Sequence, residues 1–318
     1  MAEQSPFALR TAAPITDAKF ADPYVTAKGE ERASVALQSL ETLWFNTGTL
    51  CNLACKSCYI ESSPKNDALV YLTLAEVQNY LDEIADKGLA TREIAFTGGE
   101  PFMNPDIMAI LQLCLSRGFD VLVLSNAMRP MQRFENELLA LEGTERLTIR
   151  VSLDHFTKSI HEEERGPSWE KAMDGLQWLA ANRFNIAIAG RLVEGEGAET
   201  ARAGFAKLFA ERQLPIDANN PAELVLFPQM DADADIAEIT KDCWGILGVS
   251  PQSMMCASSR MVVKRKGEDA PRVAACTLLP YQDEFDLGET LEDASGAVQL
   301  NHPHCARFCV LGGASCAA

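Results

Sequence analysis

The 318-residue sequence has little positive charge: it holds 28 Lys and Arg against 45 Asp and Glu, a formal net charge of −17. A chain this acidic repels phosphate backbones, and its one basic run, Lys264-Arg265-Lys266, is typical of a solvated turn. We therefore expect no nucleic-acid partner. The sequence also lacks any run of about 18 apolar residues, so no membrane span is predicted.

A charged region followed by an apolar one is missing at the N-terminus, so we expect no secretory signal and a cytoplasmic protein. The sequence is 47% apolar and 23% charged, which is typical of a globular domain and excludes a disordered or collagen-like chain. In a reducing compartment its ten cysteines are not expected to form disulfides. Metal binding is the first alternative.

Short β-rich runs alternate with amphipathic helical patterns along the middle of the chain. The runs cover residues 43–47, 93–96, 120–124, 147–153, 185–193 and 223–227. This alternation predicts right-handed βαβ crossovers and a parallel sheet. Six units are two short of a closed barrel, so we predict an α/β fold, a partial (βα)6 TIM-like barrel. Its site is expected at the carboxyl ends of the strands.

Three parts are predicted: a polar N-terminal lead-in (1–41), the barrel (42–235) and a small cysteine-rich C-terminal domain (236–318). Within the barrel, Thr73 and Glu76 predict a helical capping box, and Gly88 predicts the end of that helix. Asn104, before a proline, predicts the start of the next helix. In the C-terminal part, residues 261–263 and 272–274 predict the two strands of a hairpin.

Cys51, Cys55 and Cys58 fall within eight residues, in the loop after the first predicted strand. Three thiolates at these spacings can wrap one face of a cubane iron–sulfur cluster and leave one iron open for chemistry. An open coordination position is what marks a catalytic rather than a structural metal site. A zinc loop completed by a distant residue and a group of buried structural cysteines are the alternatives.

This spacing, with Tyr59 after the third cysteine, resembles that of the radical S-adenosylmethionine (radical SAM) enzymes. The run from Phe96 to Pro101 contains Gly98-Gly99-Glu100 and resembles the GGE motif of that family. Ser57 departs from the pattern, because the residue before the third cysteine is often aromatic there. The resemblance extends over residues 43–230.

The resemblance implies a [4Fe–4S] cluster on the three cysteines, whose open iron binds the amino and carboxylate groups of S-adenosylmethionine. One electron from the cluster would cleave this cofactor to methionine and a 5′-deoxyadenosyl radical. Glu100 and the two glycines would hold the amino group, and Arg165 would pair with the carboxylate. A surface ion pair with neighbouring glutamates is the alternative for Arg165. The implied cofactor-binding residues are Tyr59, Gly98, Gly99, Glu100, Ser125, Asn126, Ser152, Asp154 and Arg165, and Arg191 could reach the same cavity.

Five more cysteines lie near the C-terminus, at Cys256, Cys276, Cys305, Cys309 and Cys316. The first two flank the predicted hairpin, so their thiols can face one metal. The arrangement resembles the auxiliary-cluster extensions of SPASM or twitch type found in many radical SAM enzymes. We predict one auxiliary [4Fe–4S] cluster on four of the five, with a zinc site as the alternative. Cys114 and Cys243 are interpreted as core residues.

The sequence thus predicts a radical SAM oxidoreductase or radical-modifying enzyme with an electron donor such as flavodoxin or ferredoxin. The radical would abstract hydrogen from a small molecule or, as the second choice, from a peptide. No motif identifies that substrate. The alternative function is a non-catalytic iron–sulfur protein that transfers electrons, which has no need of Gly98-Gly99-Glu100.

Overall fold

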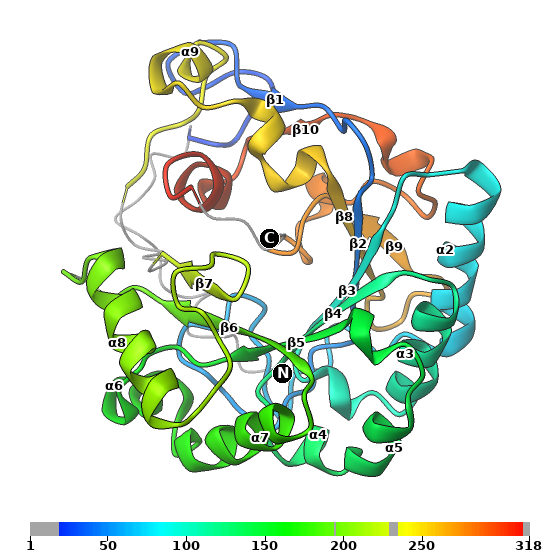
Figure 1. Ribbon diagram of the computed structural model, residues 1–318. Helices are drawn as coiled ribbons and strands as arrows, with labels where there is room; N and C mark the ends of the chain where they lie inside the picture. The colour runs from blue at the N-terminus through cyan, green and yellow to red at the C-terminus, as the bar shows by residue number, and fades with distance from the viewer. Residues whose placement is uncertain (1–18, 194, 229–234, 314–318) are drawn as a thin grey trace.

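The computed structural model describes residues 19–193, 195–228 and 235–313. Its main element is a curved sheet of eight strands with helices along the outer side (Figure 1). The strand order is β7-β6-β5-β4-β3-β2-β8-β9. The strands are β2 (Thr42–Asn46), β3 (Glu93–Thr97), β4 (Asp120–Ser125), β5 (Leu147–Ser152), β6 (Asn185–Arg191), β7 (Leu224–Phe227), β8 (Ser259–Val263) and β9 (Arg272–Ala274).

The α/β fold class is confirmed, and the sheet is consistent with a partial TIM-like barrel. Each of the six predicted strands is present, and neighbours from β2 to β7 pair in parallel. Leu43, Trp44 and Phe45 of β2 are all fully buried, which is typical of a strand covered on both faces. The helices are α2 (Leu74–Lys87), α3 (Ile107–Ser116), α4 (Arg129–Gln132), α5 (Glu135–Ala140), α6 (Lys158–Arg165), α7 (Trp169–Ala181), α8 (Ala198–Glu211) and α9 (Cys243–Leu247).

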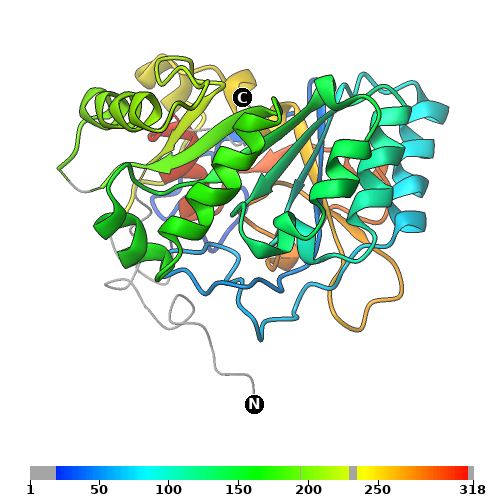
Figure 2. The ribbon, with the colours of Figure 1, turned by 60° about the horizontal axis from the view of Figure 1, so that its bottom comes forward.

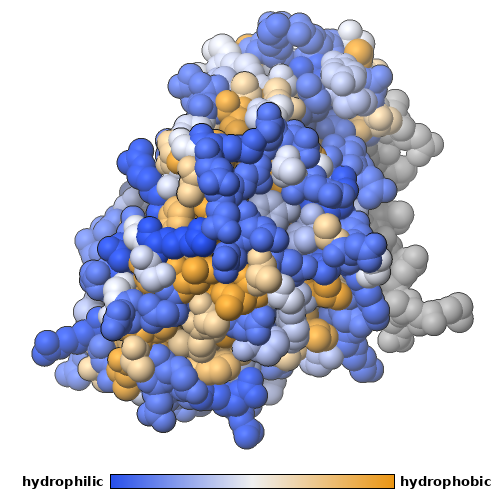
Figure 3. Space-filling model, turned by 90° about the vertical axis from the view of Figure 1, so that its right-hand side faces the viewer, coloured by the Kyte–Doolittle hydropathy of each residue, from blue (hydrophilic) through white to orange (hydrophobic). Residues whose placement is uncertain are grey.

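Helix α2 confirms the predicted ends. Thr73 and Glu76 form the capping box, and Gly88 ends the helix in the left-handed conformation. The prediction for the next helix was wrong: α3 begins after Asp106, because the Asn104 amide accepts from the Asp106 N–H and donates to the Leu72 carbonyl. The outer face over α2 and α3 is largely hydrophilic, with an apolar area in its lower half (Figure 3). Among the described residues, no helix has the length and apolar character needed to cross a bilayer.

The C-terminal segment continues the barrel sheet. Strand β8 pairs in parallel with β2 and forms the predicted hairpin with β9. The last described turn, a π-helix at Cys305–Val310 (red), lies inside the curve of the sheet, where Phe308 packs on Phe227 with ring centroids 5.5 Å apart (Figures 1 and 2). The segment before β2 reaches the same region, because β1 (Ser34–Val35) pairs with β10 (Val298–Gln299).

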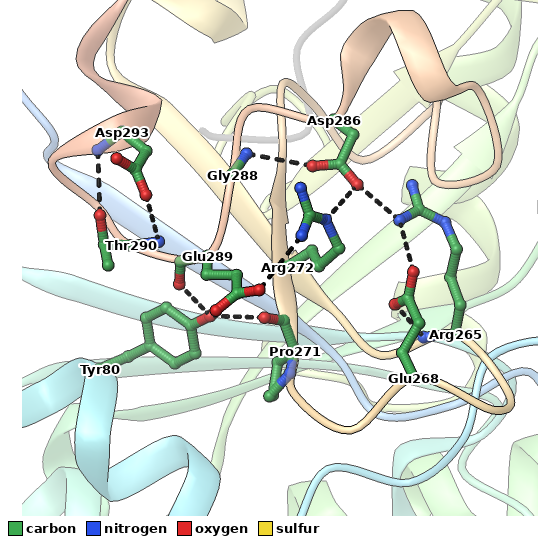
Figure 4. A network of polar contacts seen from close by, with 10 residues as sticks. All are labelled: Tyr80, Arg265, Glu268, Pro271, Arg272, Asp286, Gly288, Glu289, Thr290 and Asp293. Carbon is green, nitrogen blue, oxygen red and sulfur yellow. Dashed lines mark hydrogen bonds and ion pairs between the residues drawn. The ribbon is translucent and has the colours of Figure 1, made fainter.

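A polar network fastens the β8–β9 hairpin to the segment that follows it and to α2 (Figure 4). Asp286 accepts hydrogen bonds from Arg265 Nη1 (2.7 Å) and Arg272 Nε (2.6 Å). The Tyr80 hydroxyl of α2 donates to the Glu289 carbonyl at 2.8 Å. Burial raises the pKa of Asp286, but the hydrogen bonds from the two arginines lower it more, so the net pKa lies below its usual range.

We expect Asp286→Asn to lower the free energy of unfolding by about 1.5–3 kcal/mol at neutral pH, because charged hydrogen bonds are lost. A carboxyl with a depressed pKa in the folded protein stabilises it above the unfolded pKa, and this stabilisation is lost as the pH falls. The difference between the wild type and Asp286→Asn should therefore shrink below about pH 4. Urea unfolding at both pH values measures it.

Asp283→Asn, in the same segment but exposed, is the matched control and should change stability by less than about 0.5 kcal/mol. Equal effects of the two substitutions would contradict the assignment of the network to Asp286.

Candidate functional site

A cavity opens at the carboxyl ends of the parallel strands, enclosing about 1110 Å³ of empty space that is partly continuous with solvent. It brings together Cys51, Cys55 and Cys58, which the sequence had placed in one loop. Eight of the nine residues expected to bind the cofactor also line it, the exception being Glu100. The eight are Tyr59, Gly98, Gly99, Ser125, Asn126, Ser152, Asp154 and Arg165. Arg191, at the end of β6, lines it as well.

Backbone amides point at two of the three sulfur atoms in the loop after β2. The Leu53 N–H donates to Cys51 Sγ (3.4 Å), and the Ser62 N–H donates to Cys58 Sγ (3.3 Å). Burial raises the pKa of Cys51 to about 12, so a nearby positive centre is needed to make it a thiolate. Amide donors to sulfur suit thiolates that hold an iron–sulfur cluster, and the donor set therefore fits one.

The same loop is anchored to α6. The Ser57 hydroxyl donates to a Glu164 carboxylate oxygen (2.6 Å), and the Lys56 N–H donates to the Glu164 carbonyl (2.9 Å). Ser57, which stands where the resembling family often has an aromatic residue, thus contacts the neighbouring helix. This contact fixes the loop between the second and third cysteines.

Gly98 and Gly99 allow the end of β3 to approach that cysteine loop. A Cβ on Gly99 would lie 2.1 Å from the Leu50 carbonyl oxygen, and one on Gly98 would lie 2.6 Å from the Gly48 carbonyl oxygen. Gly98 also has a φ of 134°, which disfavours other residues. The sequence interpretation attributed both glycines to the approach of a ligand. The structure gives them a second role, close packing against the loop that carries Cys51.

Glu100 lies beneath this cavity, with its side chain almost fully buried. One carboxylate oxygen accepts from the Ser125 hydroxyl (2.9 Å) and the Phe102 N–H (3.2 Å), and the other accepts from the Asn126 N–H (2.8 Å). Burial raises the pKa of Glu100 to about 7 even though these bonds lower it. Its predicted contact with the cofactor amino group stays a prediction, while its observed contacts join the ends of β3 and β4.

We expect Glu100→Gln to keep the iron bound by Cys51, Cys55 and Cys58 but to weaken the binding of S-adenosylmethionine by about 10-fold or more. The amide cannot accept from all three donors, and a lost charge-assisted hydrogen bond is worth about 1.5–3 kcal/mol. Iron content and equilibrium dialysis with S-adenosylmethionine measure the two effects.

Glu93→Gln is the matched control, because Glu93 lies at the opposite end of β3 and accepts from the Thr42 hydroxyl (3.1 Å). It should leave the affinity for S-adenosylmethionine unchanged. Unchanged affinity in Glu100→Gln as well would mean that the motif only shapes a turn.

Asp154, Arg165 and Arg191 form the charged wall of the cavity. Arg165 Nε lies 2.8 Å from Asp154 Oδ2, and Arg191 Nε lies 3.8 Å from Asp154 Oδ1. The alternative of a surface ion pair for Arg165 is wrong, because its side chain is only 16% exposed and pairs with a buried carboxylate. Burial raises the pKa of Asp154, but the two guanidinium charges lower it more, so it stays ionised. Two cations against one carboxylate leave a positive charge suited to an anionic group.

Some lining residues were not expected from the sequence. Thr97 precedes the glycine pair, and an apolar wall comes from Phe227, Leu278 and Phe308. A signal was present for the last two, since Leu278 follows Cys276 by two residues and Phe308 precedes Cys309. Their position beside the first three cysteines depends on the folding of the C-terminal segment over the barrel opening.

A second cavity collects four of the five C-terminal cysteines. Cys256 precedes β8, Cys276 follows β9, and Cys305 and Cys309 lie in the π-helical turn; all four line it together with His304. Burial raises the pKa of Cys305 strongly, and the thiols of Cys276, Cys256 and Cys309 raise it further. The four sulfurs are therefore close enough to act on one another.

The remaining cysteines are accounted for separately. Cys316 lies outside the described residues. Cys114 is fully buried in α3, as predicted, and the Cys243 sulfur accepts from the Thr240 N–H (3.3 Å). Within 19–193, 195–228 and 235–313, no three His, Cys, Asp or Glu side chains are arranged about a single metal ion.

The two cavities share a wall. Leu278 lines both of them. Phe308 lines the first cavity, and its neighbour Cys309 lines the second. A group bound in the second cavity would therefore lie one side chain away from the first.

Comparison with known proteins adds to this geometry. Residues 45–201 match the Radical SAM superfamily. The antilisterial bacteriocin subtilosin biosynthesis protein AlbA of Bacillus subtilis (strain 168) is 34% identical over 116 residues, 36% of this chain and 25% of that protein. GTP 3′,8-cyclase of Rhodococcus opacus (strain B4) is 29% identical over 184 residues, 54% of this chain and 50% of that protein. The chain thus spans half or less of these relatives.

Two groups of solved structures share the fold. Streptococcus suis SuiB bound to S-adenosylmethionine has a TM-score of 0.58 at 12% identity, over 79% of this chain and 64% of SuiB. The enzyme anSMEcpe with bound AdoMet has a TM-score of 0.56 at 16% identity, over 80% of this chain and 76% of that one. At these identities the likeness concerns the fold alone.

Proposed function

We propose, from the Radical SAM superfamily domain formed by residues 45–201, that this enzyme cleaves S-adenosylmethionine reductively and abstracts hydrogen from a substrate. The observation that carries the proposal is the meeting of Cys51, Cys55 and Cys58 with eight expected cofactor-binding residues in one cavity. A [4Fe–4S] cluster bound there by three thiolates would supply an open iron and the electron for the cleavage.

The chain's own residues divide the work of the cavity. The three cysteines bind the cluster, and the amides of Leu53 and Ser62 stabilise their charge. Arg165, oriented by Asp154, and Arg191 would hold the carboxylate of the cofactor. The polar strand ends at Ser125, Asn126 and Ser152 would orient its ribose and methionine parts. The apolar wall would keep water away from the reacting atoms.

We infer that the auxiliary cluster uses Cys256, Cys276, Cys305 and Cys309. These four thiols share one largely apolar cavity and act on one another electrostatically. The shared wall of Leu278 would put this cluster near the substrate. In that position it would accept the second electron when the substrate is oxidised, or bind the substrate directly.

The substrate class is inferred from two relatives. One takes part in bacteriocin biosynthesis, and SuiB has been solved bound to the precursor peptide SuiA. These names favour a peptide side chain over the small molecule that the sequence alone favoured. A flavodoxin or ferredoxin remains the proposed electron donor.

Production of 5′-deoxyadenosine tests the proposal. Anaerobic protein with its clusters filled, mixed with dithionite and S-adenosylmethionine, should form 5′-deoxyadenosine and methionine. Deuterium should move into 5′-deoxyadenosine from a labelled substrate, and candidate peptides and small molecules are compared in this way. A protein that only transfers electrons would neither bind nor cleave S-adenosylmethionine.

A further inference from the structure

Arg260, in β8, is a buried cation beside the second cavity. It is 1% exposed, and its guanidinium donates to four backbone carbonyls. Nε donates to Ala294 (2.8 Å), Nη1 to Cys256 (2.6 Å) and Ser259 (2.8 Å), and Nη2 to Gly296 (2.9 Å). The guanidinium therefore clamps two turns while keeping its full charge.

No carboxylate in the described part of the chain forms an ion pair with this guanidinium. The groups whose charges act on it are the thiols of Cys256 and Cys276. A buried charge without a counter-charge is strongly unfavourable, and carbonyl dipoles compensate only part of the lost hydration. When the four cysteines hold an iron–sulfur cluster, their thiolates and the cluster together carry a net negative charge. That charge would complete the pairing.

We infer that Arg260 is a positioning residue whose charge balances the auxiliary cluster and raises its reduction potential. The inference rests on the proposed auxiliary cluster at Cys256, Cys276, Cys305 and Cys309. Reduction adds one electron, so a fixed cation close by stabilises the reduced form more than the oxidised form. A more easily reduced cluster is a better acceptor for an electron leaving a substrate in the adjoining cavity.

A purely structural role would act through the carbonyl clamp instead of the charge, and two variants separate these roles. Arg260→Lys keeps the charge but loses most of the clamp, whereas Arg260→Met loses both. Lys266→Met is the matched control, since it removes a positive charge from the exposed turn of the same hairpin.

The test uses the full chain with Cys51, Cys55 and Cys58 replaced by alanine, so that only the auxiliary cluster contributes. Its midpoint potential is measured by a dithionite titration followed by electron paramagnetic resonance. Arg260→Met should lower the ratio of reduced to oxidised cluster at a fixed potential by about tenfold, a shift of about 59 mV for one electron. Arg260→Lys and Lys266→Met should stay within about threefold of the parent.

An unchanged potential in Arg260→Met would overturn the inference. So would an equal fall in Arg260→Lys, or loss of the iron from both variants, because retained charge would then not suffice. Loss of iron from Arg260→Met alone would support it. Absence of iron from the parent would overturn the auxiliary cluster itself, and is therefore distinguished from a failure that concerns only Arg260.

Discussion

Replacing Cys51, Cys55 and Cys58 together by alanine should remove about four irons per chain and abolish cleavage of S-adenosylmethionine. The three thiols are the cysteine ligands that line the large cavity, and no other open iron is proposed. Loss of activity should be complete instead of partial, because the other lining residues can orient the cofactor but cannot supply an electron. Iron analysis and a 5′-deoxyadenosine assay on anaerobically prepared protein measure both effects.

The matched control replaces Cys114 and Cys243, which lie in helices outside both cavities. That double variant should keep the full iron content and the cleavage activity. The cluster at the C-terminal cysteines should also persist in the triple variant and give about four irons. Full iron content in the triple variant would rule out the proposed cluster site.

Single replacement of Cys256, Cys276, Cys305 or Cys309 by alanine should lower the iron content from about eight to about four per chain. Each of the four supplies one thiol to the second cavity, so the loss of one leaves an incomplete ligand set. S-adenosylmethionine should still bind in the first cavity. The free energy of unfolding should fall as well, because binding of a metal cluster to the folded chain stabilises it.

Cys316→Ala is the decisive control, since the sequence alone left open which four of the five cysteines bind. This variant should keep about eight irons. Loss of iron from Cys316→Ala together with retention in one of the other four would exchange the roles of those two residues. Quantitative iron and sulfide analysis on matched preparations distinguishes the outcomes.

Much of the fold and part of the site could be predicted because the signals were local. The alternation of short apolar runs with capped helices predicts parallel strands, and all six appear where expected. Cys51, Cys55 and Cys58 are bound to one short loop by their spacing, so they meet whatever the rest of the chain does. Polar residues at strand ends gather at one edge of a parallel sheet for the same topological reason.

Contacts between residues distant in sequence could not be predicted in this way. The sequence placed Arg165 beside neighbouring glutamates as readily as in a cavity, and only its 2.8 Å contact with Asp154 decides between them. Glu100 was expected to face the cofactor, yet its carboxylate bonds to Ser125 and Asn126 of the next strand. Side-chain direction depends on which donors the neighbouring strand presents.

The sequence by itself determined the barrel, the first three thiols and the acidic surface, because each depends on residues close in the chain or on composition alone. The tertiary structure decided which C-terminal cysteines meet and that their cavity adjoins the first one. Those facts require β8 to pair with β2 and the π-helical turn to pack on Phe227, across more than half of the chain in the first case. Such pairings are set by the total burial of the sheet and its opening, a quantity that no local pattern contains.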